Sequence, residues 1–310
     1  MSTLLITHPA CLGHEPGEYH PESPQRLRAV LAALESETFA SLKRQAAPIA
    51  TAEELTRVHP AEYVEALLHI RPEGDELAMI DGDTLMSAGS AEAALRAAGA
   101  VVAAVDAVAT GQADNAFAAV RPPGHHATPT IPGGFCLFSN VAIGARHAQA
   151  RHGIGKVAIL DFDVHHGQGT QATVEIDPSL FYGSTHQWPF YPGTGSPRER
   201  GIEDNVINVP LVANSGSTEF RAAWRDRILP QLDRFAPDMV IVSAGFDAHL
   251  RDPLAQLRLT TEDFAWITGE LMAIARRHSK GRLVSALEGG YDLEALADSA
   301  AAHVRVLMGI

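Results

Sequence analysis

The chain has 310 residues, of which 46% are hydrophobic and 20% charged, and its formal net charge is −13. This composition is typical of a soluble globular protein and excludes a disordered or fibrous one. The acidic excess argues against nucleic acid as a partner, because contacts to phosphates require a basic surface. It is compatible with cationic partners.

We expect neither a signal peptide nor a membrane-spanning segment. The N-terminal residues lack a basic start and a long apolar run, and the weakly polar segment 91–111 is interrupted by charged residues. Cys11 and Cys136 lie far apart in the sequence and do not form a CxxC pair. The sequence therefore predicts a cytoplasmic protein with two free thiols.

The predicted elements alternate between strands and helices along the whole chain. Short apolar or β-branched runs predict strands at Leu4–Thr7, Ala116–Val120, Lys156–Asp163, Leu180–Thr185, Val206–Val209, Met239–Ala244 and Leu283–Leu287. The intervening segments predict helices at Ser23–Leu34, Ala91–Ala109, Val141–Arg151, Thr218–Phe235 and Thr261–Arg277. Several strand runs are continuous, as in parallel sheets buried on both faces. We therefore predict one α/β domain over residues 1–310, with a mostly parallel central sheet and helices on both faces.

Polar side chains follow four of these strands, where the active site of such a sheet lies. Asp163 and His165 point to the same side of an extended segment because they are two residues apart, and Asp161 can share that side. Asp247 follows another strand and is the natural third metal ligand. One imidazole and two carboxylates suit a borderline-to-hard divalent ion and leave positions open for water and substrate.

The same motif bears on the number of metal ions. Dinuclear manganese hydrolases of the arginase type carry another aspartate two residues after the histidine, where this chain has Gly167. A second ion therefore lacks a ligand, although His249, two residues after Asp247, offers partial compensation. A binuclear ureohydrolase stays open as an alternative.

Seven segments in order along the chain resemble the motifs of the zinc-dependent histone deacetylase superfamily. They are His20–Arg26, Arg121–His126, Gly134–Asn140, Asp161–Gly167, Tyr191–Gly195, Ser243–Asp247 and Leu287–Tyr291. Several are similar to the class II branch and to its relatives among bacterial histone deacetylase-like and acetylpolyamine amidohydrolases. The resemblance implies an arginase–deacetylase fold with one catalytic Zn²⁺, or alternatively Fe²⁺, held by Asp163, His165 and Asp247.

The resemblance also implies the catalytic roles. His125 and His126 correspond to the tandem acid/base histidines, Asp161 to the residue that orients the first, and Tyr291 to the donor to the scissile carbonyl. Gln168 stands where relatives carry Asp or Asn beside the second histidine. A neutral amide stabilises an imidazolium less than a carboxylate does, so Gln168 favours a neutral His126 as general base.

Further positions match the walls of the family's acyl-lysine tunnel. Phe135, next to Gly134, and Tyr191 match its two aromatic rings, and Tyr191 makes a wall that is usually phenylalanine more polar. His20 is expected near the pocket. Leu254 lies seven residues after the third zinc ligand, where vertebrate polyamine deacetylases carry glutamate, and leucine favours acyl-lysine or another less cationic substrate.

The resemblance implies structural potassium as well. One K⁺ site would use Asp161, Asp163, His165, Ser184 and Thr185, and a second monovalent site would use carbonyls around Val174, Asp177 and Leu180.

These observations predict an amidohydrolase that removes acetyl or short acyl groups from amines by metal-activated water. There is no Gly-x-Ser-x-Gly motif to suggest a covalent intermediate. Acyl-lysine peptides are the favoured substrates, with acetylpolyamines and small metabolites as alternatives. A non-catalytic acyl-lysine reader would be expected to lack Tyr291 or a zinc ligand, whereas all are present. Assembly into a homo-oligomer is left open.

Overall fold

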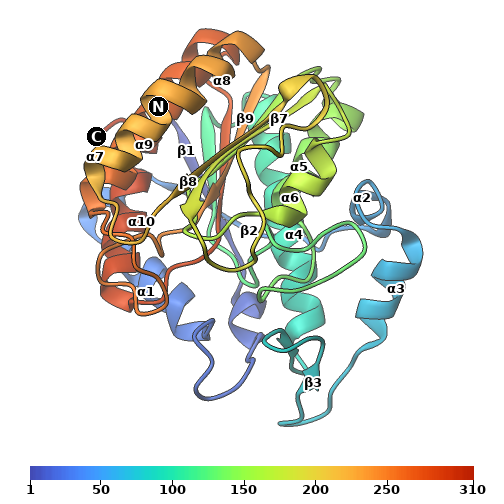
Figure 1. The fold of residues 1–310 in the computed structure, drawn as a ribbon. Coiled ribbons are helices and arrows are strands. Elements are labelled where there is room, and N and C mark those ends of the chain that lie inside the picture. The colour runs from blue at the N-terminus through green and yellow to red at the C-terminus, as the bar shows by residue number, and fades with distance from the viewer.

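A computed structural model describes all 310 residues, and its centre is one parallel sheet of eight strands (Figure 1). The strand order is β2-β1-β5-β10-β9-β6-β7-β8. The strands are β1 (Thr3–Thr7), β2 (Lys43–Ala46), β5 (Asn115–Ala118), β6 (Val157–Asp161), β7 (Leu180–Gln187), β8 (Val206–Leu211), β9 (Met239–Ala244) and β10 (Leu283–Leu287). A separate antiparallel pair consists of β3 (Ala78–Met79) and β4 (Leu85–Met86).

Helices cover both faces of the sheet (Figure 1). On one side α4 (Ser90–Ala109) packs on α5 (Asn140–His152), near α2 (Ala52–Leu55), α3 (Ala61–His69) and α6 (Gln168–Val174). On the other lie α1 (Pro24–Ala33), α9 (Thr261–His278), α10 (Leu293–Met308), α7 (Ser217–Ala223) and α8 (Leu229–Phe235). Short 3₁₀ helices span Pro9–Gly13, Glu37–Phe39 and Ile202–Asp204. None of the helices is long and apolar enough to cross a membrane.

The predicted α/β fold is confirmed, and each predicted strand is present in the sheet. Several elements were not predicted, among them the short helices α2, α3 and α6 and the β3–β4 pair. Three further differences have a clear physical reason. The edge strand β2 was not predicted, because its side chains are exposed and carry no apolar pattern. Helix α10 was also missed, since polar Ser299 and His303 interrupt its buried face. The helix predicted at residues 218–235 contains a π-helical turn, Trp224–Ile228, between α7 and α8.

The central strands position the functional site. β5, β6, β9 and β10 are buried along their whole length, as expected for apolar runs covered on both faces. Asp161 at the end of β6 pairs in register with Ser243 of β9, and Ala244 pairs with Leu287 of β10. The loops that follow these strands therefore leave the sheet at one edge, where their side chains meet.

Candidate metal centre and active site

Three candidate metal ligands meet where β6 and β9 end. Asp163 and His165 follow β6, Asp247 follows β9, and all three residues are buried. His165 Nδ1 lies 3.0 Å from Asp163 Oδ1 and 3.2 Å from Asp247 Oδ2. One ligand atom from each residue lies within 4.8 Å of the other two. The structure therefore brings together the three ligands named from the sequence.

The surroundings of these residues fit a divalent cation. Asp247 Oδ2 is buried without a hydrogen-bond partner, which is costly unless another group or an ion compensates it. A Cβ atom on Gly289 would lie 2.1 Å from this oxygen, and one on Gly245 would lie 2.0 Å from Asp163 Oδ2. The two glycines thus leave space around the carboxylates. An imidazole nitrogen and two carboxylates form a donor set that zinc accepts.

No comparable group of ligands for a second metal ion lies beside Asp163, His165 and Asp247. His249 lies outside the ligand group, and its Nδ1 accepts a hydrogen bond from the Arg251 N–H at 3.2 Å. A side chain at Gly167 would place its Cβ 2.4 Å from Asp161 Oδ2. The geometry therefore weighs against the binuclear alternative.

Each of the tandem histidines has its own hydrogen-bond partner. His125 Nδ1 lies 3.0 Å from Asp161 Oδ2, and His126 Nδ1 lies 2.6 Å from Gln168 Oε1. The two imidazole centroids are 4.0 Å apart. His125 Nε2 lies 3.8 Å from Asp163 Oδ1, so this histidine faces the candidate ligands.

The two imidazoles differ in their affinity for protons. Burial disfavours the His125 cation, but the carboxylates of Asp163 and Asp161 outweigh burial and hold the pKa of His125 well above its usual range. Burial, together with the positive charge of neighbouring imidazoles, holds the pKa of His126 well below its usual range. The difference arises because only the first histidine is paired with a carboxylate.

Glu288 was not assigned a role from the sequence, yet it holds the tandem-histidine loop. Its Oε2 accepts hydrogen bonds from the N–H groups of Gly124 and His125, at 2.7 and 3.2 Å. Its Oε1 accepts one from the Ser243 hydroxyl at 3.0 Å. Burial raises the pKa of Glu288 to about 7. The available signal was an acidic residue directly after a buried strand, which is rare without a partner.

Tyr182 on β7 was also missed, and it fixes Asp161. Its hydroxyl donates to Asp161 Oδ2 at 3.0 Å and accepts from the Gly167 N–H at 3.0 Å. Nothing in the sequence distinguished this tyrosine from other apolar residues of its strand.

His165 of the candidate ligand group and the tandem histidines line a pocket of about 210 Å³. It is lined by Asp83, Pro123, His125, His126, Gly134, Phe135, His165, Phe190, Tyr191, Leu254, Gly289 and Tyr291. The Phe135 ring lies edge-on to Tyr291, with centroids 6.1 Å apart. Phe190, missed in the sequence although it precedes Tyr191, stacks on His165 at 5.3 Å.

The sequence placed both Gly134 and His20 at the pocket, but only Gly134 lines it. Gly134 belongs to the wall and has a positive φ of 55°, and a Cβ atom there would lie 2.4 Å from the His126 ring. His20 does not line the pocket. It packs edge-on against Phe135 with centroids 4.7 Å apart, and its Nε2 donates to the Asp83 carbonyl at 3.0 Å. His20 therefore supports the wall from behind.

Tyr291 is held by its backbone and by Arg26. Its N–H donates to Asp252 Oδ2 at 2.8 Å. Arg26 donates to the carbonyls of Glu288 and Gly290 at 2.5 and 2.6 Å, and its guanidinium lies 4.9 Å from the Tyr291 ring centroid. Burial raises the pKa of Tyr291 well above its usual range, so the hydroxyl stays a donor.

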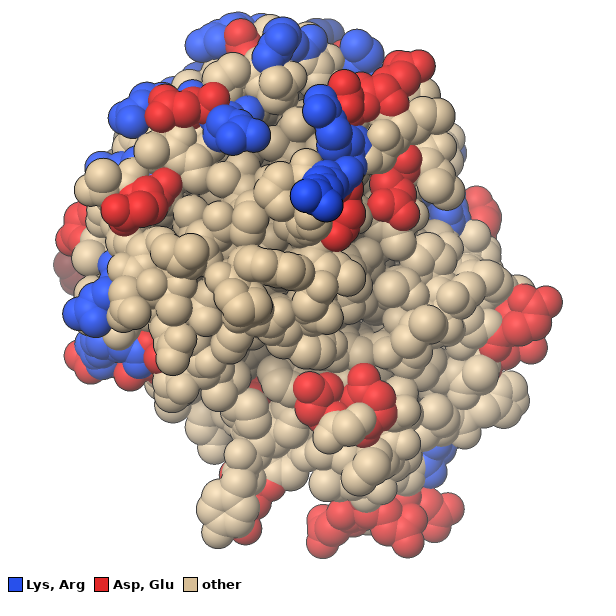
Figure 2. All heavy atoms as spheres, viewed as in Figure 1, with Lys and Arg blue, Asp and Glu red and all other residues tan.

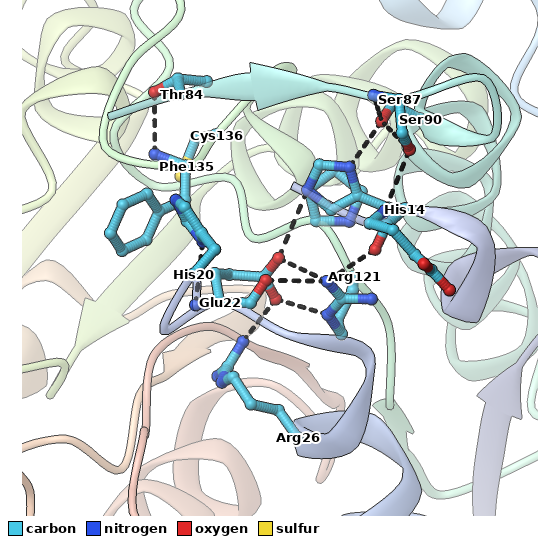
Figure 3. Close-up of polar contacts among 12 residues, drawn as sticks. His14, His20, Glu22, Arg26, Thr84, Ser87, Ser90, Arg121, Phe135 and Cys136 are labelled. Atoms are coloured by element: carbon cyan, nitrogen blue, oxygen red, sulfur yellow. Dashed lines mark hydrogen bonds and ion pairs between the residues drawn. The ribbon is translucent and has the colours of Figure 1, made fainter. Parts of the chain in front are cut away.

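Arg26 is in turn anchored by a buried carboxylate, as Figure 3 shows. Glu22 Oε1 accepts from Arg26 at 2.8 Å, and Glu22 Oε2 accepts from Arg121 at 2.7 Å. Burial alone would raise the pKa of Glu22, but the two guanidinium groups and His14 hold it well below its usual range. This buried cluster ties the N-terminal loop to the segment that carries Tyr291.

The three carbonyl groups that were predicted to bind a second monovalent cation do lie close together, but they accept hydrogen bonds from a side-chain amide. Asn205 Nδ2 donates to the carbonyls of Val174, Asp177 and Leu180 at 2.8, 2.9 and 2.9 Å. At the other predicted potassium site, Ser184 is paired in register with Asp161 and its hydroxyl contacts His186 Nδ1 at 3.0 Å. Potassium binding stays a prediction at both sites, and at the second the Asn205 amide already pairs with the three predicted carbonyls.

Comparison with known proteins assigns this fold and site to a family. Residues 20–307 match the histone deacetylase domain. The chain belongs to the histone deacetylase family. It is 40% identical to histone deacetylase 14, chloroplastic, of Arabidopsis thaliana, over 99% of this chain and 77% of that protein. It is 40% identical to the histone deacetylase-like amidohydrolase of Pseudomonas aeruginosa, over 92% of this chain and 74% of that protein.

The family relationship extends to the three-dimensional structure and to the activity. The crystal structure of the HDA15 HD domain superposes with a TM-score of 0.93 at 37% identity, covering 99% of this chain and 88% of that one. Human polyamine deacetylase HDAC10 is 38% identical over the whole chain, which spans 48% of that protein. The predicted family and arginase–deacetylase fold are confirmed, and this chain is a deacetylase, a hydrolase of amide bonds.

Proposed function

We propose that this chain is a zinc-dependent amidohydrolase that removes acetyl or short acyl groups from amines, with acyl-lysine peptides as its preferred substrates and residues 1–310 as one catalytic domain. The observation that carries this proposal is that His165 of the candidate ligand group, the tandem histidines and Tyr291 all line one pocket. Both cysteines are buried and unpaired, in keeping with the cytoplasmic location that we also propose.

Zinc, held by Asp163, His165 and Asp247, would supply Lewis acidity toward water and the substrate carbonyl. The protein supplies the proton transfers. The Nδ1–H group of His126 donates a hydrogen bond to Gln168 Oε1, so the Nε2 atom is free to accept a proton from the attacking water. His125, paired with Asp161, protonates the leaving amine.

Tyr291 completes the arrangement by donating its hydroxyl to the oxygen of the scissile carbonyl. Negative charge develops on that oxygen during the reaction, and a preorganised donor in a buried pocket stabilises it. The edge-on packing of Phe135 and the bonds from Arg26 to the neighbouring carbonyls hold the tyrosine in place. The rings of Phe135, Phe190 and Tyr191 exclude water from the acyl-amine chain.

Two residues that line the pocket, Leu254 and Asp83, bear on which substrate it accepts. Leu254 contributes no charge there, which favours acyl-lysine, whereas Asp83 would attract the second cationic centre of an acetylpolyamine. On the face shown in Figure 2, Lys and Arg gather at the α8 end and acidic side chains around β3, without a basic patch across the middle. Acetylpolyamines and small acylated metabolites are therefore the second candidate substrates.

The proposed role of Tyr291 is tested by Tyr291→Phe, assayed with an acetyl-lysine peptide on zinc-loaded protein. We expect kcat to fall about 10²–10³-fold with KM changed only a few-fold, because the hydroxyl acts on developing charge. Zinc content and circular dichroism should match those of the wild type. The exposed Tyr19→Phe variant is the control and should retain full activity. Unchanged turnover in Tyr291→Phe would refute the role.

The substrate is tested separately with a panel of acetyl-lysine peptide, N-acetylputrescine and longer acyl-lysines. The highest kcat/KM is expected for the acetyl-lysine peptide. A higher value for N-acetylputrescine would transfer the proposal to polyamines without affecting the reaction type. Loss of activity after chelation, restored by one zinc per chain, is expected in either case.

A further inference from the structure

A second group of metal-ligating side chains lies at the seam between α4 and α5, outside the pocket described above. Asp106 belongs to the last turn of α4, and His147 and His152 belong to α5. The Nε2 atoms of both histidines lie 2.6 Å from Asp106 Oδ1. The three ligand atoms lie within 4.8 Å of one another. We propose that this seam site binds a divalent transition metal such as Zn²⁺, Ni²⁺ or Cu²⁺.

The position of Asp106 supports a cationic ligand. Carbonyl groups at helix C-termini carry partial negative charge, so a carboxylate in the last turn is disfavoured and a cation is favoured. α4 ends at Ala109 and α5 ends at His152 itself, so Asp106 and His152 both lie in the last turn of their helices. A divalent ion there would neutralise the Asp106 carboxylate.

Exposure and chemistry match a site that exchanges its ion with solvent. Side-chain exposure is 4% for His147, 17% for His152 and 47% for Asp106. The buried His147 is thus held in place by its surroundings, while the half-exposed Asp106 leaves the site open to an ion and its bound water. Two imidazole nitrogens and one carboxylate oxygen suit zinc, copper and nickel, with remaining positions taken by water.

Arg57 opposes metal binding in the structure as it stands. Its Nη1 lies 2.5 Å from His147 Nδ1. A guanidinium can only donate, so His147 Nδ1 accepts and the ring carries its proton on Nε2, the atom that would bind the metal. Binding requires the proton to move to Nδ1 and Arg57 to turn away. Arg57 has a second partner in the exposed Glu53, at 2.9 Å, toward which it can move.

The site is tested by titrating zinc-loaded holoenzyme with one equivalent of Cu²⁺ and recording its electron paramagnetic resonance spectrum. Hyperfine coupling to two nitrogen nuclei is expected, whereas the catalytic centre offers one histidine. His152→Gln should reduce the coupling to one nitrogen and weaken Cu²⁺ binding at least tenfold by calorimetry. His278→Gln is the matched control, because His278 also pairs with one aspartate, Asp233, at 2.8 Å but without a second imidazole.

Arg57→Met provides an independent test, since it removes the competing donor and should tighten Cu²⁺ binding about tenfold. The kcat/KM for the acetyl-lysine peptide should stay within twofold of wild type in His152→Gln and Arg57→Met. A spectrum with one nitrogen or none in the wild type would overturn the proposal. Cu²⁺ binding that is unchanged in His152→Gln would overturn it too.

Discussion

The Nδ1 atom of His126 lies 2.6 Å from the side-chain oxygen of Gln168. Because an amide oxygen only accepts, the imidazole carries its proton on Nδ1 and leaves Nε2 unprotonated. Gln168 is the first residue of α6, so a helix fixes the acceptor. The longer side chain thus reaches the imidazole that Asp or Asn contacts in relatives, and it selects the tautomer that a general base needs.

Removal of this acceptor should slow catalysis without weakening substrate binding. We expect Gln168→Ala to lower kcat about 10–100-fold at nearly constant KM, since general base catalysis contributes about 10²–10⁴-fold and the ring loses its orientation. Gln168→Glu keeps an acceptor oxygen at the same distance and should retain activity within about tenfold. Steady-state kinetics of both variants decide this, and equal losses in the two would contradict a role for the acceptor.

A charge introduced at Leu254 should shift substrate preference. Leu254 lines the pocket and is 37% exposed. Leu254→Glu should raise the kcat/KM ratio of N-acetylspermidine to acetyl-lysine peptide about five- to tenfold, because a partly exposed ion pair contributes about 1 kcal/mol. Leu254→Gln has nearly the same shape without the charge. If Leu254→Gln shifts the ratio as much, the change is steric.

Removal of the Asn205 amide should leave buried carbonyls without donors. Asn205→Ala is expected to lower the free energy of unfolding by about 1–3 kcal/mol. K⁺ should restore part of this loss, because the carbonyls of Val174, Asp177 and Leu180 would then be free to coordinate an ion. Urea unfolding in potassium chloride and in choline chloride measures the effect. An identical response to K⁺ in Asn205→Ala and wild type would disprove it.

The buried Glu22 should contribute far more to stability than a surface carboxylate. Glu22→Gln leaves Arg26 and Arg121 buried without an anion, which should cost about 3–5 kcal/mol of unfolding free energy. Glu92→Gln is the matched control. Its partner Arg96 has the same four-residue spacing, but Glu92 is 54% exposed, so less than about 1 kcal/mol is expected. Similar losses in urea unfolding would contradict this distinction.

Acid should destabilise the fold through the buried His303. Burial lowers the pKa of His303 from 6.5 to about 3. Between these two pKa values the unfolded chain binds a proton at His303 that the folded chain does not. The contribution of His303 to the free energy of unfolding is therefore fully present above pH 6.5 and is lost progressively as the pH falls toward 3. The slope is up to about 1.4 kcal/mol per pH unit.

The contribution of His303 is isolated by comparing variants between pH 6.5 and 5. His303→Asn keeps a polar group near Thr268 but does not titrate, so its unfolding free energy should fall less steeply than that of the wild type. The exposed His69→Asn should retain the wild-type slope. Parallel curves for His303→Asn and wild type would show that His303 does not carry the effect.

The order of strands and helices was predictable because the central strands are buried on both faces and therefore read as continuous apolar runs. The exposed strand β2 was not, since its stability comes from backbone pairing with β1, which leaves no mark on side-chain polarity. Burial, more than intrinsic strand preference, is what makes an element visible in the sequence.

The sequence by itself determined the family and the position of polar groups after buried strands, because strands buried on both faces read as apolar runs that end in polar residues. It also paired Asp163 with His165 on the expectation of an extended segment, whereas β6 ends at Asp161 and residues 163–165 form a bend. Only the tertiary structure decided which groups support them. Glu288 beneath the tandem histidines, Tyr182 on Asp161 and Phe190 on His165 are contacts between separate elements. Such contacts depend on strand register and side-chain packing, which arise only when distant segments assemble.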